Sequence, residues 1–138
     1  MEDLIFSEIS VLQRAEHDKI VKLVEILEDS SNFYLGMELL EGRDLAALVA
    51  DSFYNERDAA KIIKQVLEGL NYLHKLGIVH RDIKLANVVK TSSSDDNLQV
   101  KIVDMGFSVF QYSQQEETDF CGSAIYMAPE ILLHRPYD

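Results

Sequence analysis

The 138-residue sequence is poor in features that would assign it to several common classes of protein. Its single cysteine, Cys121, excludes an internal disulfide and a cysteine-based zinc site. No apolar run approaches the length of a membrane span, and the acidic N-terminus has the wrong charge for a secretory signal. We therefore expect no membrane association and a soluble protein of the cytoplasm or nucleus.

Positive charge is also scarce. Lys and Arg total 13 against 24 Asp and Glu, which gives a formal net charge of -11 at pH 7. Because so acidic a chain repels a phosphate backbone, we expect no nucleic-acid partner and favour protein partners, basic peptides among them. Hydrophobic residues make up 47% of the chain, enough for a core, and the length suits one domain or part of one.

The apolar spacing predicts an α+β chain. Spacings of three and four residues indicate helices, partial alternation indicates strands, and turn residues separate them. From Gly106 onward the periodicity is lost. The expected elements are the end of a helix at 4–15, an antiparallel hairpin of 20–27 and 33–40, a short helix from Asp44, a long helix at 56–75 ending before Gly77, and short strands at 78–79, 88–89 and 100–103, the last two paired as a hairpin.

The residues that carry chemistry follow the long helix. Asp82, Lys84 and Asn87 occur within eight residues, and Asp104 comes at the end of a later strand. A hairpin between the flanking strands would bring Asn87 and Asp104 side by side, and their oxygens suit Mg²⁺, which takes further ligands from phosphate and water. Asp82 could then accept a proton from a hydroxyl, and Lys84 would place positive charge on a transferring phosphoryl group.

Three separated motifs occur in order: His80-Arg81-Asp82 followed by Lys84 and Asn87, then Asp104-Met105-Gly106, then Ala128-Pro129-Glu130. This set resembles the catalytic domain of eukaryotic serine/threonine protein kinases, most closely the calcium/calmodulin-dependent group, over essentially the whole chain. The resemblance implies a partial kinase-like fold. Residues 1–40 would be an upper-lobe remnant with the end of helix C and two strands, and residues 41–138 a lower-lobe part with the catalytic loop and activation segment.

The resemblance also implies ATP and Mg²⁺ as cofactors and a role for each motif residue. Asp82 would orient and deprotonate the substrate hydroxyl, and Lys84 would contact the γ-phosphate. Asn87 and Asp104 would hold magnesium. Ser123 would belong to the segment that docks the substrate beside Asp82.

Upstream positions are assigned by the same resemblance. Glu8 would pair with a strand lysine, Met37 would be the gatekeeper, and the Glu38 carbonyl and the Leu40 amide would meet adenine. Asp44 would lie near the ribose or a substrate arginine. Taken alone, Glu8 fits a solvated helix face and Asp44 fits a helix N-cap.

The activation segment departs from the usual kinase pattern. Asp119 stands where many relatives carry a phosphorylated threonine, so its carboxylate could pair with Arg81 and partly mimic a phosphate. It could also be one member of a solvated acidic run. Thr118 and Ser113 are the remaining candidate phosphorylation sites.

The sequence before Glu8 contains neither the Gly-rich loop nor the strand lysine of a kinase. We therefore expect an interior slice of a kinase domain, produced by truncation of a longer kinase, that transfers phosphate weakly or not at all alone. The alternative is a non-catalytic interaction module derived from a kinase. Without the strand that carries this lysine, the strand at 33–40 would form an open sheet edge. We expect the chain to form oligomers through that edge.

Overall fold

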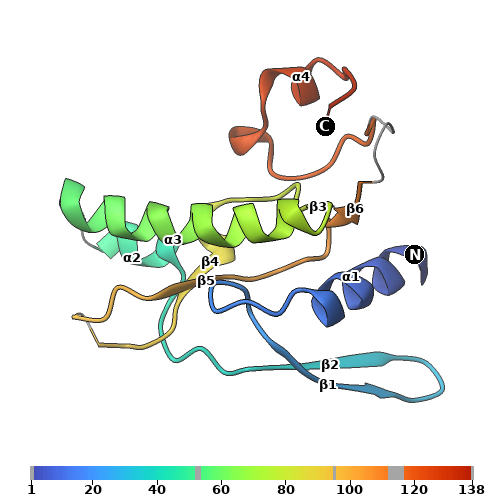
Figure 1. The fold of residues 1–138 in the computed structure, drawn as a ribbon, viewed down its shortest axis with the longest axis horizontal. Helices are drawn as coiled ribbons and strands as arrows, with labels where there is room; N and C mark the ends of the chain where they lie inside the picture. Colours follow the sequence, from blue (N-terminus) through green and yellow to red (C-terminus); the bar gives the residue numbers. More distant parts are fainter. Residues whose placement is uncertain (1, 52–53, 95, 112–116, 138) are drawn as a thin grey trace.

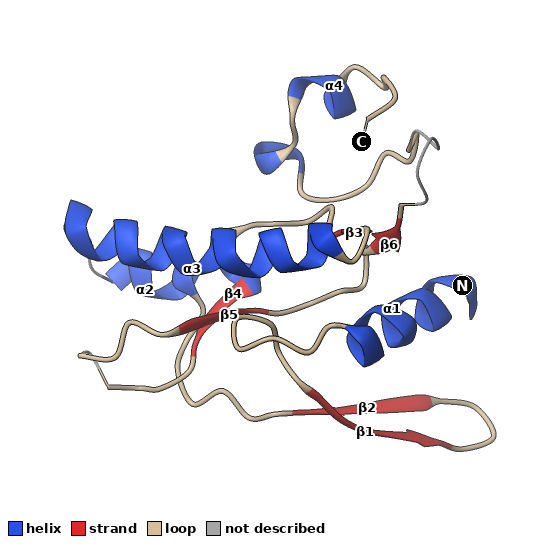
Figure 2. Cartoon of the chain, in the orientation of Figure 1, coloured by secondary structure: helices blue, strands red, loops and turns tan. Residues whose placement is uncertain are grey.

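The computed structural model describes residues 2–51, 54–94, 96–111 and 117–137. Helix α3 crosses the middle of the molecule, with the β1–β2 hairpin on one side and the C-terminal segment on the other (Figure 1; Figure 2). None of the helices in these ranges is long and apolar enough to cross a membrane. The elements are α1 (Glu2–Arg14), β1 (Leu23–Glu28), β2 (Phe33–Met37), α2 (Leu45–Asp51), α3 (Glu56–Lys75), β3 (Ile78–Val79), the 3-10 turn η1 (Leu85–Asn87), β4 (Val88–Lys90), β5 (Val100–Ile102), β6 (Val109–Phe110), the 3-10 turn η2 (Ala124–Tyr126) and α4 (Pro129–Leu132).

Helix α3 forms where the sequence predicts it because both of its ends carry local signals. The Asn55 side chain caps the first turn by accepting a hydrogen bond from the Asp58 amide at 2.9 Å. Gly77 ends the helix with a φ of 69°, a left-handed conformation that glycine adopts without strain. Between them, Val66 and Leu73 lie on the buried face of the helix. The end of this helix therefore fixes the position of the motif that starts at His80.

The strands of the described residues pair as three separate antiparallel ribbons, β1–β2, β3–β6 and β4–β5. The predicted hairpin of β4 and β5 is present, with Val88 opposite Ile102. In the part of the chain that the structure describes, no strand covers the outer edge of β2. One set of apolar side chains on the β1–β2 ribbon is exposed, Val24 by 63% and Leu27 by 56%, whereas Leu23 and Leu35 pack against the core.

The core joins α1, α3 and β5 into one cluster that includes Val11, Leu73 and Ile102. Strand β5 is held from two sides. The Ile102 amide donates to the Lys19 carbonyl at 2.9 Å, and the Val100 amide donates to the buried Gln65 side chain at 3.2 Å. Because β5 leads directly into the Asp-Met-Gly motif, this packing fixes where that motif lies.

The structure differs from the sequence prediction at two strands and in the segment after Gly106. The first hairpin strand begins at Leu23 rather than at residue 20, because the Val21 amide bonds to the Ile102 carbonyl and ties residues 20–21 to β5. The second ends at Met37 rather than at residue 40. The segment after Gly106 holds short elements that periodicity did not reveal: β6 has two residues and α4 has four.

Candidate active site

His80 anchors the loop that carries the first motif. Its side chain is buried, its Nδ1 accepts a hydrogen bond from the Asp82 amide at 3.2 Å, and its Nε2 lies 3.4 Å from the Val103 carbonyl. Since Nδ1 accepts, the proton of the neutral ring is on Nε2 and donates to Val103. Burial lowers the pKa of the His80 imidazole below its ordinary value, although nearby carbonyl and carboxylate groups oppose the shift. His80 is thus a structural residue that fixes the backbone on either side of the site.

Three predicted site residues converge around the buried carboxylate of Asp82. Lys84 Nζ lies 2.6 Å from Oδ2, and Asn87 Nδ2 donates to the same oxygen at 3.1 Å. Ser123 Oγ donates to Oδ1 at 2.8 Å and accepts from Lys84 at 3.0 Å. Arg81, with a φ of 66°, makes the turn that precedes this carboxylate. The constellation joins the catalytic loop to a residue 41 positions later in the chain.

These contacts set the charge of Asp82. Burial disfavours the ionised carboxylate, but the hydrogen bonds from Lys84 and Ser123 outweigh it and hold the pKa of Asp82 below its ordinary value. At neutral pH the group is therefore an anion with three hydrogen-bonded neighbours. Such a carboxylate can accept a hydrogen bond from a hydroxyl and orient it.

Asn87 and Asp104 are brought into neighbouring positions by the β4–β5 hairpin. The Val103 amide donates to the Asn87 carbonyl at 2.9 Å, so Asp104 follows directly after a residue bonded to Asn87. Asp104 is exposed, and its Oδ1 accepts the Gly106 amide at 3.2 Å. The Asn87 amide nitrogen is committed to Asp82, which leaves the amide oxygen as its ligand atom. Among the described residues no cluster of three or more His, Cys, Asp or Glu could hold a metal.

This donor set fits magnesium, which needs one or two protein oxygens and takes phosphate and water for the rest. Glu8 on α1 adds a second carboxylate to this region. A methyl group built on Gly106 would lie 3.2 Å from Asp104 Oδ1 and 3.8 Å from Glu8 Oε2. Burial, and then the charge of Asp104, raise the pKa of the Glu8 carboxyl. The Glu8 side chain is therefore half-buried beside a like charge, which differs from a solvated helix face.

The predicted adenine-binding residues lie on the segment after β2. The Glu38 carboxylate accepts from the Lys22 amide at 2.7 Å and pairs with Lys101 on β5 at 2.5 Å. Leu40 is half-buried against the core, whereas Met37, the predicted gatekeeper, is 47% exposed. The Glu38–Lys101 pair ties this segment to the strand that leads to Asp104.

Asp44 lies where the N-cap interpretation placed it. Its carboxylate accepts a hydrogen bond from the Ala47 amide at 2.9 Å, in the first turn of α2. The backbone beside it forms an isolated bridge with Val89 on β4. Asp44 therefore has a structural role in the described chain, and its proximity to a ribose stays a prediction.

The Arg81 side chain contacts several residues of the activation segment. Its Nε donates to the Phe107 carbonyl at 2.6 Å, and one terminal nitrogen lies 3.1 Å from Asp119 and 3.6 Å from Glu117. The Arg81–Asp119 contact is the one that a phosphate mimic would make, although the Asp119 side chain is 69% exposed. Thr118 is exposed, and Ser113 lies outside the described residues.

Glu117 belongs to none of the sequence motifs. Its contact with Arg81 joins residues 36 positions apart, and no local pattern signals such a contact.

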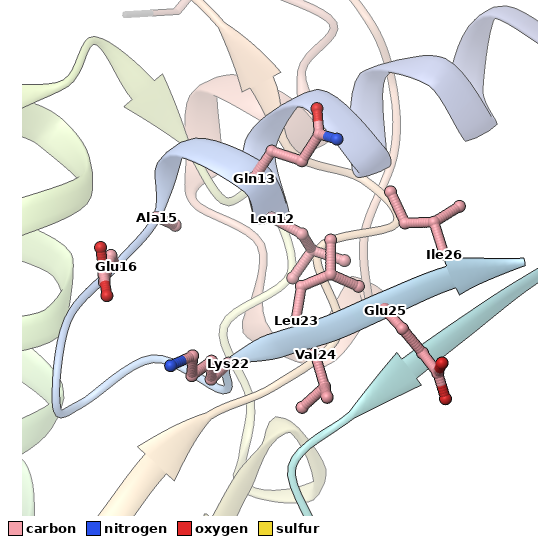
Figure 3. Close-up of a pocket in the computed structure, with 9 residues that line it drawn as sticks. All are labelled: Leu12, Gln13, Ala15, Glu16, Lys22, Leu23, Val24, Glu25 and Ile26. Atoms are coloured by element: carbon pink, nitrogen blue, oxygen red, sulfur yellow. The ribbon is translucent and has the colours of Figure 1, made fainter.

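Two cavities differ in their relation to these residues. A cavity of about 210 Å³ opens beside Asp82 and Ser123 and is walled by η2 and α4. A larger one of about 380 Å³ lies between the end of α1 and β1, where Leu12, Leu23 and Ile26 face it (Figure 3). The larger cavity contains none of the predicted site residues. The smaller one is therefore the candidate substrate-side cavity.

The structure thus brings residues of the kinase-like motifs side by side around Asp82 and along the β4–β5 hairpin. The family model described as the protein kinase domain matches residues 1–138, and the chain belongs to the protein kinase family. It is 41% identical over 137 residues to calcium/calmodulin-dependent protein kinase type 1 of Macrobrachium nipponense, covering 99% of this chain and 39% of that protein. It is 38% identical over 135 residues to sperm motility kinase 2B of Mus musculus, covering 97% of this chain and 27% of that protein. The chain thus spans well under half the length of these relatives, and their similarity agrees with the predicted serine/threonine class.

Proposed function

We propose that this chain supplies the catalytic loop and activation segment for transfer of the ATP γ-phosphoryl group to a Ser or Thr hydroxyl of a protein. The observation that carries the proposal is the hydrogen-bonded set of Asp82, Lys84, Asn87 and Ser123. An anionic carboxylate with a cation and an amide both hydrogen-bonded to it provides the groups that this reaction needs.

Each residue has a distinct task. The substrate hydroxyl oxygen forms a bond to the γ-phosphorus while the bond from that phosphorus to the β-phosphate oxygen breaks, and Asp82 accepts the hydroxyl proton. Lys84, held by Asp82 and Ser123, provides positive charge for the γ-phosphoryl oxygens. Asn87 and Asp104 would hold magnesium, which when bound neutralises phosphate charge. Glu38 and Leu40 would offer backbone groups to adenine, and Glu8 would meet a lysine.

The activation segment would be ordered without a phosphate. Asp119 and Glu117 both place carboxylates beside the Arg81 guanidinium, so two single charges occupy the place of one phosphate. Because Asp119 is mostly exposed, the individual pair is weak, and the proposal depends on both carboxylates acting together.

The direct test is Asp82→Asn in the full-length protein. We expect phosphotransfer to a Ser/Thr peptide to fall by about 10²- to 10⁴-fold, the range for loss of a general base. Asp51→Asn, at an exposed ion pair on α2, is the matched control and should leave the rate unchanged. Unchanged phosphotransfer in Asp82→Asn would remove Asp82 from its role.

Calorimetry with MgATP separates this function from the non-catalytic module. Magnesium-dependent ATP binding that Asp104→Asn weakens supports the enzyme. Absence of ATP binding by the full-length protein would favour the module.

A further inference from the structure

A short C-terminal strap, residues 134–137, lies along the activation segment. Glu117 and Tyr137 exchange two backbone hydrogen bonds, with the Glu117 amide on the Tyr137 carbonyl at 2.9 Å and the reverse pair at 3.0 Å. Three residues away, the rings of Phe120 and His134 stack with centroids 4.6 Å apart. The strap and the activation segment are therefore paired at two points, one through backbone and one through aromatic rings.

The strap places the Tyr137 hydroxyl among the groups that hold Arg81. This hydroxyl donates to the Asp119 carbonyl at 3.0 Å and accepts from the Arg81 guanidinium at 3.5 Å. The Arg81 side chain is only 3% exposed, so the contact is made away from bulk water. Tyr137 thus links the backbone of the activation segment to the residue that precedes Asp82.

The position of the activation segment on Arg81 matters because Ser123 lies just beyond it. At Gly122, with a φ of 100°, an added Cβ would lie 2.5 Å from the Arg81 carbonyl, so the two backbones approach each other closely. The next residue, Ser123, donates to Asp82. A shift of the segment between 119 and 122 would therefore move the hydroxyl that orients the Asp82 carboxylate.

We propose that Tyr137 is a positioning residue for phosphotransfer, whose hydroxyl fixes the activation segment on Arg81 so that Ser123 holds Asp82. The inference rests on the proposed kinase function and adds to it a residue outside the three motifs. Unlike the carboxylates of Glu117 and Asp119, the Tyr137 hydroxyl forms a hydrogen bond with the main chain of the segment, at the Asp119 carbonyl. The phenol also accepts from the same Arg81 nitrogen that pairs with Asp119, so the two side chains act through one guanidinium.

The test is Tyr137→Phe in the full-length protein, which keeps the ring and removes only the hydroxyl. We expect kcat/KM for a Ser/Thr peptide to fall by about 3- to 10-fold, the effect of one lost hydrogen bond, with the KM for ATP within twofold of wild type. Amide exchange in residues 117–123 should quicken by a similar factor. Tyr34→Phe, which loses a hydroxyl contact with Asp29 in the β1–β2 turn, is the control and should change neither measurement.

A double-mutant cycle that combines Tyr137→Phe with Asp119→Ala distinguishes positioning of the segment from general destabilisation of the protein. If both side chains act through Arg81, the double variant should lose less activity than the product of the two single losses. Unchanged peptide kinetics in Tyr137→Phe, an equal rise in both KM values, or losses that multiply independently would overturn the proposal.

An inactive wild-type protein would instead contradict the proposed kinase function. The exchange measurement would still decide whether the hydroxyl holds the segment. Exchange at 117–123 that matched wild type would refute that hold as well.

Discussion

Removal of the Ser123 hydroxyl tests the electrostatics of the site without removing any charged group. Ser123→Ala deletes the 2.8 Å hydrogen bond to the buried Asp82 carboxylate and leaves Lys84 and Asn87 in place. A hydrogen bond to a charged group contributes roughly 1.5–3 kcal/mol. Because Ser123 is only half-buried and water can replace part of the bond, we expect a loss of about 1.5 kcal/mol in the free energy of unfolding at pH 7.

The pH dependence gives this prediction its sign. The folded-state pKa of Asp82 lies below the ordinary 3.8, so the carboxylate contributes stability above that pH and loses it as the pH falls through the folded value. The variant keeps less of this contribution. The difference in stability between wild type and Ser123→Ala should therefore be largest at neutral pH and shrink below about pH 4.

Urea unfolding of the chain between pH 7 and pH 3, in EDTA, measures the effect. Ser123→Thr keeps a hydroxyl on the same β-carbon and is the matched control, which we expect to stay within about 0.5 kcal/mol of wild type. A stability difference that did not vary with pH would refute the reasoning, because it would show that Ser123 contributes packing alone.

Three further predictions concern other parts of the molecule. His80, with a pKa lowered from 6.5, should stay neutral to a lower pH than an exposed histidine in an NMR titration of its ring carbons. Because the unfolded chain binds that proton more readily, this site favours unfolding as the pH falls below 6.5. Gln65→Ala should cost about 1–3 kcal/mol in urea unfolding, since it leaves the buried Val100 amide and the half-buried Leu98 carbonyl without their side-chain partner. Gln13→Ala on the exposed face of α1 should be neutral. If the open edge of the β1–β2 ribbon drives association, Leu27→Lys should reduce oligomers in sedimentation, and Leu67→Lys, a similarly exposed change on α3, should not.

Elements with their own local signals could be predicted from the sequence. Helix α3 matched its predicted range because one stripe of apolar residues, an Asn cap and a terminal glycine all occur within it. The β4–β5 hairpin followed from two short apolar runs joined by a polar loop. The neighbourhood of Asn87 and Asp104 then followed from the pairing of two strands rather than from any property of the side chains.

Contacts between distant segments could not be predicted in this way. Strand β6 is two residues long and exists through its pairing with β3, about 30 positions earlier. The partners of Arg81 are similar, because Glu117 and Tyr137 reach it from 36 and 56 positions away. Motif resemblance supplied Asp119 as an Arg81 partner, yet only the folded chain shows that a tyrosine hydroxyl joins it.

Glu8 and Asp82 make a final contrast, since the two carboxylates are shifted in opposite directions. Hydrogen bonds stabilise the anion of Asp82, whereas burial and the charge of Asp104 destabilise that of Glu8 and raise its pKa above 4.5. Ionised Glu8 therefore costs stability at neutral pH, and the cost disappears as the pH falls through its raised value.

Glu8→Gln should accordingly stabilise the chain at pH 7, because it removes a charge that burial and Asp104 both disfavour. Solvent screening keeps the gain below about 1 kcal/mol, and the gain should vanish near pH 4. Thermal unfolding in EDTA measures it, with Glu28→Gln at the exposed end of β1 as the control. The repulsion between Glu8 and Asp104 also makes the region favour a cation, so millimolar Mg²⁺ should raise the melting temperature of wild type more than that of Glu8→Gln. Equal responses to Mg²⁺ in the two proteins would show that the Glu8 carboxylate does not contribute to the negative potential around Asp104. The assignment of the magnesium site would then rest on Asn87 and Asp104 alone.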